Sequence, residues 1–315
     1  MVLRAVRSAD DAFMPALGVL VAIALAFVGI GAFIYFIHHT ATSIRASHIV
    51  FAIAGDTISA IDAAYPDPIQ AQEEAPGIAT MDWRGIQAWK SGFVQTVDLA
   101  SLADFAESED CVARMELGVG DFVVKGAHLV SFHGRCDDKA ARAAVKEAYA
   151  IGQDRTIEQD PAFGLQQLKD IALKALSPAV NDTMTALMCI DQFGAALSCL
   201  GGRHVHDASM HRSGKLRLVL SCQSYDSLTD LCFDEVRYHG SSNPVLLSRI
   251  LSVLQQASRF TRDSTRRSTL AAHARVTIQA LHDTGHLWRD RGALLSRAED
   301  IRGELEAPLR ERPDL

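Results

Sequence analysis

The chain has 315 residues, with 38 acidic and 31 basic side chains, and its net charge is −7. A hydrophobic content of 48% excludes wholesale disorder. The acidic balance argues against a nucleic-acid partner, because phosphate binding needs clustered Lys and Arg. The run from Ala12 to Ile44 has 33 residues without Asp, Glu, Lys or Arg. About 20 apolar residues already span a bilayer, so this run excludes a simple soluble protein and predicts the lipid bilayer as a partner.

The apolar segment 13–37 is predicted to be a transmembrane helix. It is longer than the roughly 7 to 15 apolar residues of a signal peptide, and no small-residue cleavage site follows it. Gly18, Ala22 and Ala26 recur every four residues, so one face of the helix carries small side chains. Such a face favours close packing in lipid, and it predicts a homo-oligomer or contact with other membrane helices.

The helical period continues past the membrane segment. Apolar and small residues recur at steps of three and four up to Tyr65, which predicts an amphipathic helical stalk in the remainder of region 1–65. Pro66 ends it. Residues 66–82 combine three prolines with acidic and polar residues, a composition typical of a linker.

Residues 83–136 are predicted to form a small β-rich module. Gly92–Val97 alternates as a strand does, and glycines flank a β-branched segment in Val119–Gly126, as in a hairpin. Leu99–Ser108 is predicted as a short helix. The string from Gly120 to Val130 resembles biotinyl and lipoyl carrier domains, which implies a barrel-like or sandwich-like shape. The Met-Lys or Asp-Lys signature of those carriers is missing, so no cofactor is expected.

Residues 137–306 are predicted to form a mainly α-helical domain, followed by a tail at 307–315. A strand is expected at 215–220 by alternation. The predicted helices cover 137–153, 161–176, a segment after Asn181 or Asp182, 226–239, 243–256, 265–283 and 287–305. The fold class is therefore a membrane helix joined to a soluble α+β region.

The polar loop between two of these helices is the main candidate for a functional motif. Ser177, Asn181, Asp182 and Thr185 offer hydroxyl, amide and carboxylate oxygens, which suit a small ligand or a hard cation. The same side chains could instead cap the helix ends and satisfy backbone groups. No nucleophile–base pair is visible near the loop, so no catalytic residue is predicted.

Two groups of histidines are further candidates. His38 and His39 lie at the edge of the membrane segment, where ionisable groups can handle protons or ions, and where they can also serve as ordinary anchors. His204, His206 and His211 could chelate a metal, but they fall in a Gly-rich and Ser-rich stretch without a fixed element to hold them. A surface loop is the default interpretation there, and no metal site is predicted.

Six cysteines are spread along the chain without a Cys-x-x-Cys pair. This spacing matches neither a zinc ribbon nor a recognisable disulfide framework. The cysteines are therefore expected to be reduced and mostly buried, which indicates a cytosolic location for the region after the membrane helix.

Four motifs resemble a known family. They are Phe36–Ile44, Ser91–Gln95, Gly120–Val123 and Ala175–Ala186, and their order and spacing are similar to those of domain-of-unknown-function family 2254, predicted bacterial membrane proteins. The resemblance implies a multi-pass protein of the inner membrane with a cytosolic domain after four spans. It also implies that the chain lacks the first three transmembrane helices. The family carries no established activity.

The expected function is that of an uncharacterised integral-membrane protein with a non-enzymatic role. A channel, a transport component and a signalling component all fit a membrane helix joined to a cytosolic domain that senses or gates. The alternative is a membrane-bound enzyme, or a protein that binds a small ligand or ion, with the loop from Ser177 to Thr185 as its site.

Overall fold

The computed structural model describes residues 16–43, 46–65, 82–203, 209–284 and 291–306. The chain divides into two compact units after Ile49. The predicted linker 66–82 lies almost wholly outside the described residues, as does the tail 307–315.

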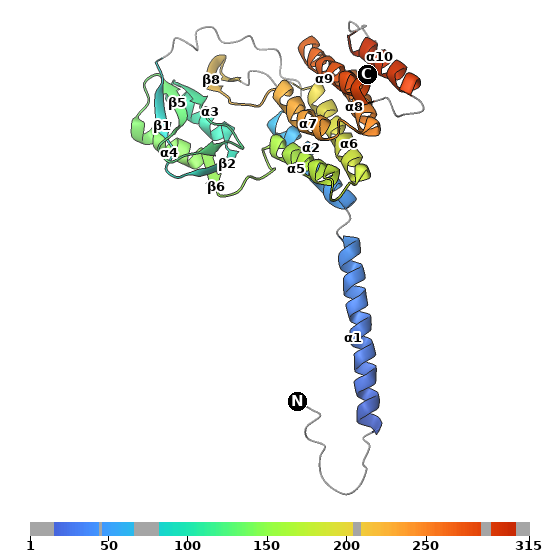
Figure 1. The fold of residues 1–315 in the computed structure, drawn as a ribbon. Coiled ribbons are helices and arrows are strands. Elements are labelled where there is room, and N and C mark those ends of the chain that lie inside the picture. The colour runs from blue at the N-terminus through green and yellow to red at the C-terminus, as the bar shows by residue number, and fades with distance from the viewer. Residues whose placement is uncertain (1–15, 44–45, 66–81, 204–208, 285–290, 307–315) are drawn as a thin grey trace. The chain divides into compact units, whose positions relative to one another are not determined.

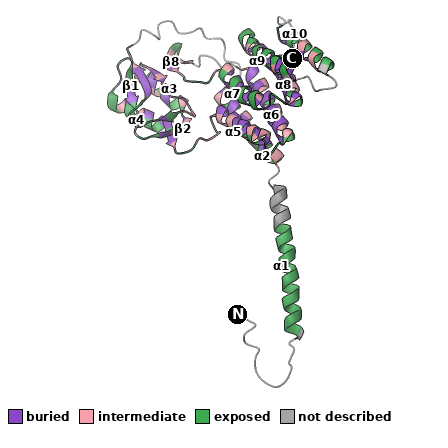
Figure 2. Ribbon diagram, viewed as in Figure 1, coloured by how far each residue is buried: buried purple, intermediate pink, exposed green. Residues whose placement is uncertain are grey.

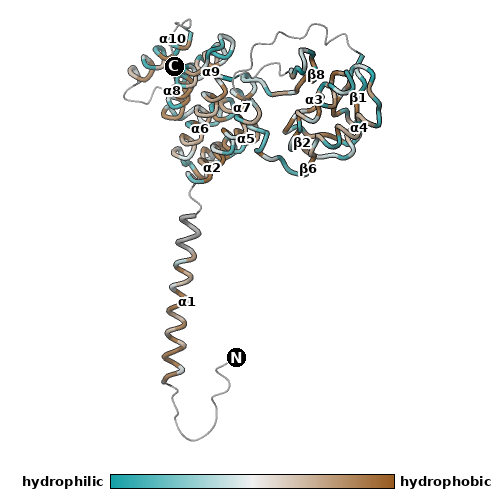
Figure 3. Tube along the Cα trace, turned by 180° about the vertical axis from the view of Figure 1, so that it is seen from behind, coloured by the Kyte–Doolittle hydropathy of each residue, from teal (hydrophilic) through white to brown (hydrophobic). Residues whose placement is uncertain are grey.

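The described part of the first unit is the helix α1, Ala16–Ser43, together with residues 46–49 at the start of the next helix (Figure 1). Its segment Leu17–Phe36 is apolar over 20 residues, and none of it is buried by the rest of the protein. Figure 2 shows this exposure along the helix, and the brown colour of α1 in Figure 3 shows that most of its residues are hydrophobic. At about 1.5 Å per residue, 20 helical residues match the hydrocarbon thickness of a bilayer. Length and composition therefore allow α1 to cross a membrane.

A second helix, α6 (Thr183–Gly201), is also long and apolar enough to cross a membrane, but its environment is different. About 61% of its apolar stretch is buried inside the protein. Phe193 on α6 packs edge-to-face against Phe233, with ring centroids 5.9 Å apart. The apolar character of α6 is thus explained by a core position in the second unit.

The second unit contains a helical core. The helices that contribute buried residues to it are α2 (Ala46–Ala64), α5 (Pro161–Leu176), α6, α7 (Tyr225–His239), α8 (Pro244–Phe260), α9 (Ser264–Thr284) and α10 (Arg291–Glu306). The segment predicted as an amphipathic stalk includes α2. The apolar face of α2, which includes Val50, Ala54 and Ile61, is buried in the helical core.

Close backbone packing joins α2 to α5. A Cβ atom placed at Gly164 would lie 2.0 Å from Oγ1 of Thr57. Thr57 is 1% exposed, and its hydroxyl donates to the carbonyl of Ile53 at 2.6 Å. Only glycine therefore permits this approach of the two helices.

The β-rich module has a separate hydrophobic core. Its strands are β1 (Arg84–Gln87), β2 (Gly92–Val97), β3 (Val112–Met115), β4 (Phe122–Val123), β5 (His128–His133), β6 (Tyr149–Gly152), β7 (Ser209–Arg212) and β8 (Lys215–Val219). Two helices accompany them, α3 (Leu99–Ser108) and α4 (Asp138–Ala148). The core extends beyond residue 136, because α4, β6 and Leu218 of β8 contribute buried residues.

The strands form two open sheets. One has the order β1-β5-β3-β8-β7 and the other the order β4-β2-β6, so the expected barrel is not found. All pairs are antiparallel except β3 and β8, in which Ala113 pairs with Leu218 in parallel. The predicted hairpin around Gly126 also differs, since β4 pairs with β2 while β5 pairs with β1 and β3.

Local capping explains where most helices of the second unit begin. An Asp, Ser or Asn side chain accepts a backbone N–H of the first turn and so satisfies a group that the helix leaves free. The capping residues are Asp98 for α3, Asp137 for α4, Asp160 for α5, Asp182 for α6, Ser224 for α7 and Asn243 for α8. Pro161 and Pro244 occupy first-turn positions, where the missing N–H costs nothing.

Candidate ligand-binding cavity

The second unit contains a cavity of about 580 Å³. Its walls come from segments that are far apart in the chain. They are the end of α2, the β2–α3 junction, Met115 on β3, the turn before β4, the α4–β6 junction, the start of α5 and the segment 220–223. The size falls in the range of about 300 to 1,000 Å³ that is usual for sites of small organic ligands. Because both hydrophobic cores supply wall residues, an occupant would contact both.

A buried ion pair supports the wall at the start of α5. Nε and Nη2 of Arg155 donate to Oδ2 of Asp160, at 2.9 and 2.6 Å. The other carboxylate oxygen accepts the amide of Phe163 at 3.0 Å. Burial raises the pKa of Asp160, and the hydrogen bonds and charge of Arg155 oppose that rise. The carboxylate therefore caps α5 and holds Arg155 in place.

The turn before β4 fits closely against this ion pair. A Cβ atom at Gly120 would lie 2.3 Å from Oδ2 of Asp160, and the φ of Gly120 is 92°. A Cβ at Gly118 would lie 2.4 Å from the carbonyl oxygen of Ser221. Both positions thus need glycine, and the turn contacts segments that lead into α5 and α7.

Two tyrosines present phenol groups at the cavity wall. The hydroxyl of Tyr65 donates to the carbonyl of Gln223 at 3.3 Å, and that of Tyr149 lies 3.5 Å from the carbonyl of Leu117. Burial raises the pKa of both phenols above the ordinary value, and the carboxylate of Asp121 adds to the rise at Tyr149. Both tyrosines are therefore neutral hydrogen-bonding groups at physiological pH.

The wall is chemically suited to non-covalent binding. It is about half polar and half apolar, with Leu99, Met115 and Leu220 among the apolar residues. Histidine, lysine and arginine do not occur among the residues that the structure places in the wall. A general base of the histidine type is thus not available in this lining.

Most polar side chains of the predicted loop make local hydrogen bonds at the helix ends. Asp182 caps α6, since its carboxylate accepts both the amide and the hydroxyl of Thr185, the amide at 3.1 Å. These bonds lower the pKa of Asp182. The hydroxyl of Ser177 donates to the carbonyl of Lys174 at 2.7 Å. Three of the four predicted side chains therefore satisfy groups at the helix ends.

Asn181 is the fourth member and lines a second hollow. Its φ is 49°, a left-handed conformation that Asn tolerates better than most residues. The hollow measures about 320 Å³ and is shared with Thr183, His239 and Asn243. Nδ2 of Asn243 donates to Oγ1 of Thr183 at 3.2 Å. This hollow is mostly polar and connects the caps of α6 and α8.

The structure does not describe the side chains of most of the predicted histidines. His38 and His39 lie in α1, but their side chains are outside the described part. His204 and His206 lie in the segment 204–208, which is also outside it, and His211 lies on β7.

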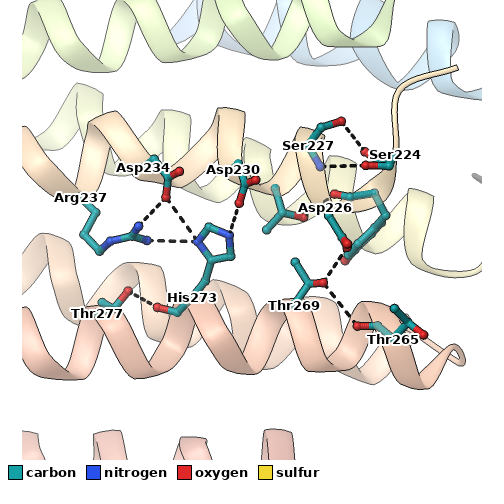
Figure 4. A network of polar contacts seen from close by, with 12 residues as sticks. Ser224, Asp226, Ser227, Asp230, Asp234, Arg237, Thr265, Thr269, His273 and Thr277 are labelled. Carbon is teal, nitrogen blue, oxygen red and sulfur yellow. Dashed lines mark hydrogen bonds and ion pairs between the residues drawn. The ribbon is translucent and has the colours of Figure 1, made fainter.

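A polar network between α7 and α9 was not predicted (Figure 4). Nε2 of His273 lies 2.9 Å from Oδ1 of Asp230, and Nη1 of Arg237 lies 3.1 Å from Nδ1 of the same ring. Arg237 also pairs with Asp234. In the sequence, polar residues recur at steps of three and four along α7. This repeat and His273 on α9 are the signal that could have indicated the network.

The two hydrogen bonds of His273 define its tautomer. An arginine N–H can only donate, so Nδ1 accepts, and Nε2 carries the proton that it donates to Asp230. Burial lowers the pKa of His273, and the charge of Arg237 lowers it further. The ligand atoms of Asp230, Asp234 and His273 lie within 4.8 Å of one another, as in many metal sites. Here the guanidinium of Arg237 already supplies the cation, and the group links two helices.

These features define a protein with an apolar helix long enough to span a membrane and a second unit that has two hydrophobic cores and a cavity. The chain belongs to the family of predicted membrane proteins called DUF2254, whose family model matches residues 1–256. Uncharacterised proteins from two strains of Mycobacterium tuberculosis and from Mycobacterium bovis are 31% identical to it over 306 residues. The alignment covers 94% of this chain and 58% of each relative, so the chain spans little more than half the length of the relatives. No solved structure matches the chain.

Proposed function

We propose that this chain is the ligand-sensing part of a non-enzymatic signalling or gating protein in the membrane. The observation that carries the proposal is the position of Ala63 and Ala64, the last residues of the helix α2, and of the next residue, Tyr65, in the wall of the 580 Å³ cavity. The same helix follows α1 in the chain, with two residues between their ends. A ligand in the cavity would therefore contact the helix that leads to the membrane segment.

A close contact between α2 and α5 supports the transmission of such a signal. Gly164 lies against Thr57, and α5 begins at the cavity with its cap Asp160 and with Pro161. Packed elements that shift as units can carry a binding signal over a distance. Binding in the cavity would then change the position or the stability of α2.

The placement of the protein is part of the proposal. The six cysteines, all within the described residues, form no disulfide, which fits a reducing compartment and thus a cytosolic location for the second unit. Gly18, Ala22 and Ala26 would pack against other membrane helices, either of a second copy or of a multi-pass protein in the inner membrane. The net charge of −7 makes a nucleic-acid partner unfavourable.

A cavity-filling substitution tests the proposal without knowledge of the ligand. Ala150 on β6 is exposed to the cavity, and Ala150→Trp places an indole there that mimics an occupant. In the full chain in lipid nanodiscs, we expect the amides of residues 57–64 to exchange hydrogen about threefold or more slowly than in the wild type. Hydrogen exchange followed by mass spectrometry measures this change.

The matched control is Ala143→Trp, which adds the same side chain at an exposed position of α4 outside the cavity. It should leave exchange in α2 unchanged. Unaltered exchange in α2 of Ala150→Trp, together with a blue-shifted emission that shows a buried indole, would refute the coupling of the cavity to α2.

A further inference from the structure

We propose that the ligand of the cavity is an amphipathic organic cation, an alkylammonium group joined to an apolar body. The inference rests on the proposed function, because it names the chemical class that the sensing cavity binds. Four acidic residues line the cavity, namely Asp98, Asp121, Glu147 and Asp160, and the lining has no basic residue among the described positions. Arg155 neutralises Asp160 from outside the lining, so three carboxylates remain to attract a cation.

Hydrogen bonds hold the carboxylates of Asp98 and Asp121, and the third acidic residue lies on a helix. Asp98 caps α3 and accepts the amide and the hydroxyl of Ser101, at 3.0 and 2.7 Å. Asp121 accepts the amide of Gly118 at 2.8 Å. Glu147 lies on α4 and is exposed. In the described parts of the chain none of the three forms an ion pair within 4 Å, so their charge is not compensated locally.

The neutral polar groups of the wall point to the same ligand class. The phenol protons of Tyr65 and Tyr149 are directed to carbonyl oxygens, so the phenol oxygens are left as acceptors. An ammonium group offers only donors and therefore complements them. Burial raises the pKa of both phenols, and the charge of Asp121 raises that of Tyr149 further, which agrees with a negative potential beside this phenol.

The apolar half of the wall accounts for the body of the ligand. Val97, Leu99, Met115 and Leu220 line the cavity together with several alanines. A small inorganic cation would leave this surface without a partner and would fill a minor part of about 580 Å³. An organic cation gains from burial of its hydrocarbon and from the carboxylates at the same time.

Three probes that share the same hydrocarbon body and differ in charge test the inference. They are 4-phenylbutylammonium, neutral 4-phenylbutan-1-ol and anionic 4-phenylbutyrate, titrated calorimetrically into the full chain in nanodiscs, with empty nanodiscs as the blank. We expect the cation to bind at least about tenfold more tightly than either analogue, because three carboxylates without an ion-pair partner line the cavity. Binding should weaken as salt is raised.

Isosteric variants remove the charge and keep the shape. Asp98→Asn preserves a cap, Asp121→Asn preserves an acceptor, and Glu147→Gln alters an exposed side chain. The triple variant should lose about tenfold in affinity for the cation, and Glu147→Gln alone should lose part of it. The control is the triple variant Asp56→Asn, Asp104→Asn and Asp170→Asn, which changes the net charge equally at exposed sites outside the cavity and should bind as the wild type does.

The outcomes separate this inference from the proposed function. Equal or weaker binding of the cation relative to its analogues would overturn the ligand class, and so would an equal loss in the control variant. Neither result would affect the coupling of the cavity to α2, which the exchange experiment on Ala150→Trp measures independently. Failure of all three probes to bind, or an unchanged affinity of the triple variant, would also overturn the inference.

Discussion

Arg155 donates both Nε and Nη2 to the same oxygen of Asp160, while the second oxygen of that carboxylate caps α5. Asp160 is 3% exposed, so its charge depends on this partner. One interaction thus fixes the start of α5 and a wall of the cavity. The turn at Gly120 packs against the same atoms.

Substitution of Arg155 should be strongly destabilising. In Arg155→Met the buried carboxylate loses its partner, and we expect the free energy of unfolding to fall by about 3 kcal/mol. Arg155→Lys keeps the charge but loses the two parallel donors, so its loss should be smaller. Urea unfolding followed by tryptophan fluorescence measures both. An equal stability of Arg155→Met and the wild type would show that the pair is not needed.

We predict that the stability of the protein depends on the protonation of Asp160. Burial raises the pKa of Asp160 in the folded protein above the value of 3.8 expected when unfolded. The folded state then binds the proton more tightly, so the contribution of Asp160 to stability falls as pH rises from about 3.8 through the raised pKa. Asp160→Asn should flatten the stability profile in this acidic window. A profile unchanged by the substitution would contradict the assignment.

The contact of α2 with α5 predicts opposite results for two glycines. Gly164→Ala should cost about 2 kcal/mol, because its Cβ would overlap the hydroxyl of Thr57. Gly55→Ala, on α2 with no atom within 4 Å of the new Cβ, should stabilise by up to about 1 kcal/mol. Thr57→Ala should partly restore Gly164→Ala in a double-mutant cycle. Additive effects of the two substitutions would exclude a direct contact.

The start of α6 can be tested at its cap. Asp182→Ala should reduce stability by about 1 kcal/mol, whereas Asp182→Asn should change it by a few tenths. Since hydrogen bonds from Thr185 lower the pKa of Asp182, the stabilisation is present above pH 3.8 and is lost as pH falls through the lowered value. Thermal unfolding of the variants at pH 7 and pH 3 measures this difference. A cost of Asp182→Ala that did not shrink at low pH would contradict the ionised cap.

Asn181 tests the alternative interpretation of the loop as an active site. Its φ of 49° predicts that Asn181→Gly folds normally and that Asn181→Ala loses about 1 kcal/mol. Loss of a cellular function in folded Asn181→Gly would favour a role of the side chain in binding or chemistry. Full function of that variant would favour the backbone role.

His273 predicts a loss of stability between pH 7 and pH 5. Its folded pKa lies below the ordinary 6.5, so its contribution is complete above pH 6.5 and declines as pH falls toward the lowered value. Protonation would also oppose Arg237, although Asp230 and Asp234 moderate that cost. His273→Gln keeps a donor toward Asp230 and should show a smaller difference in melting temperature between pH 7.5 and pH 5.5. An unchanged difference would assign the pH dependence to other groups.

Local signals predicted several elements of the fold. The predicted limits of α3 and α5 agree with the structure, because Asp98 and Pro161 mark helix starts through nearby backbone atoms. The predicted helix 137–153 ends earlier, at Ala148, since residues 149–152 pair with β2 as the strand β6. That pairing depends on a partner about 55 residues away, and helical periodicity does not report it.

The cavity could not be predicted in the same way. Its wall combines Tyr65, Asp121, Tyr149 and Gln223, and none of these residues stands in a local pattern that indicates a site. Their proximity follows from packing of two cores. The loop around Asp182 could be predicted as a candidate site because its polar residues are close together in the chain. Its capping hydrogen bonds are equally local.

The parallel pairing of β8 with β3 bears on how the protein is synthesised. Leu218 is completely buried in the core of the β-rich module, yet α5 and α6 precede it in the chain. A nascent chain that ends before residue 215 leaves the edge of β3 without its partner, and exposed strand edges promote aggregation. The five-stranded sheet of the module is therefore completed only after α5 and α6 have been synthesised.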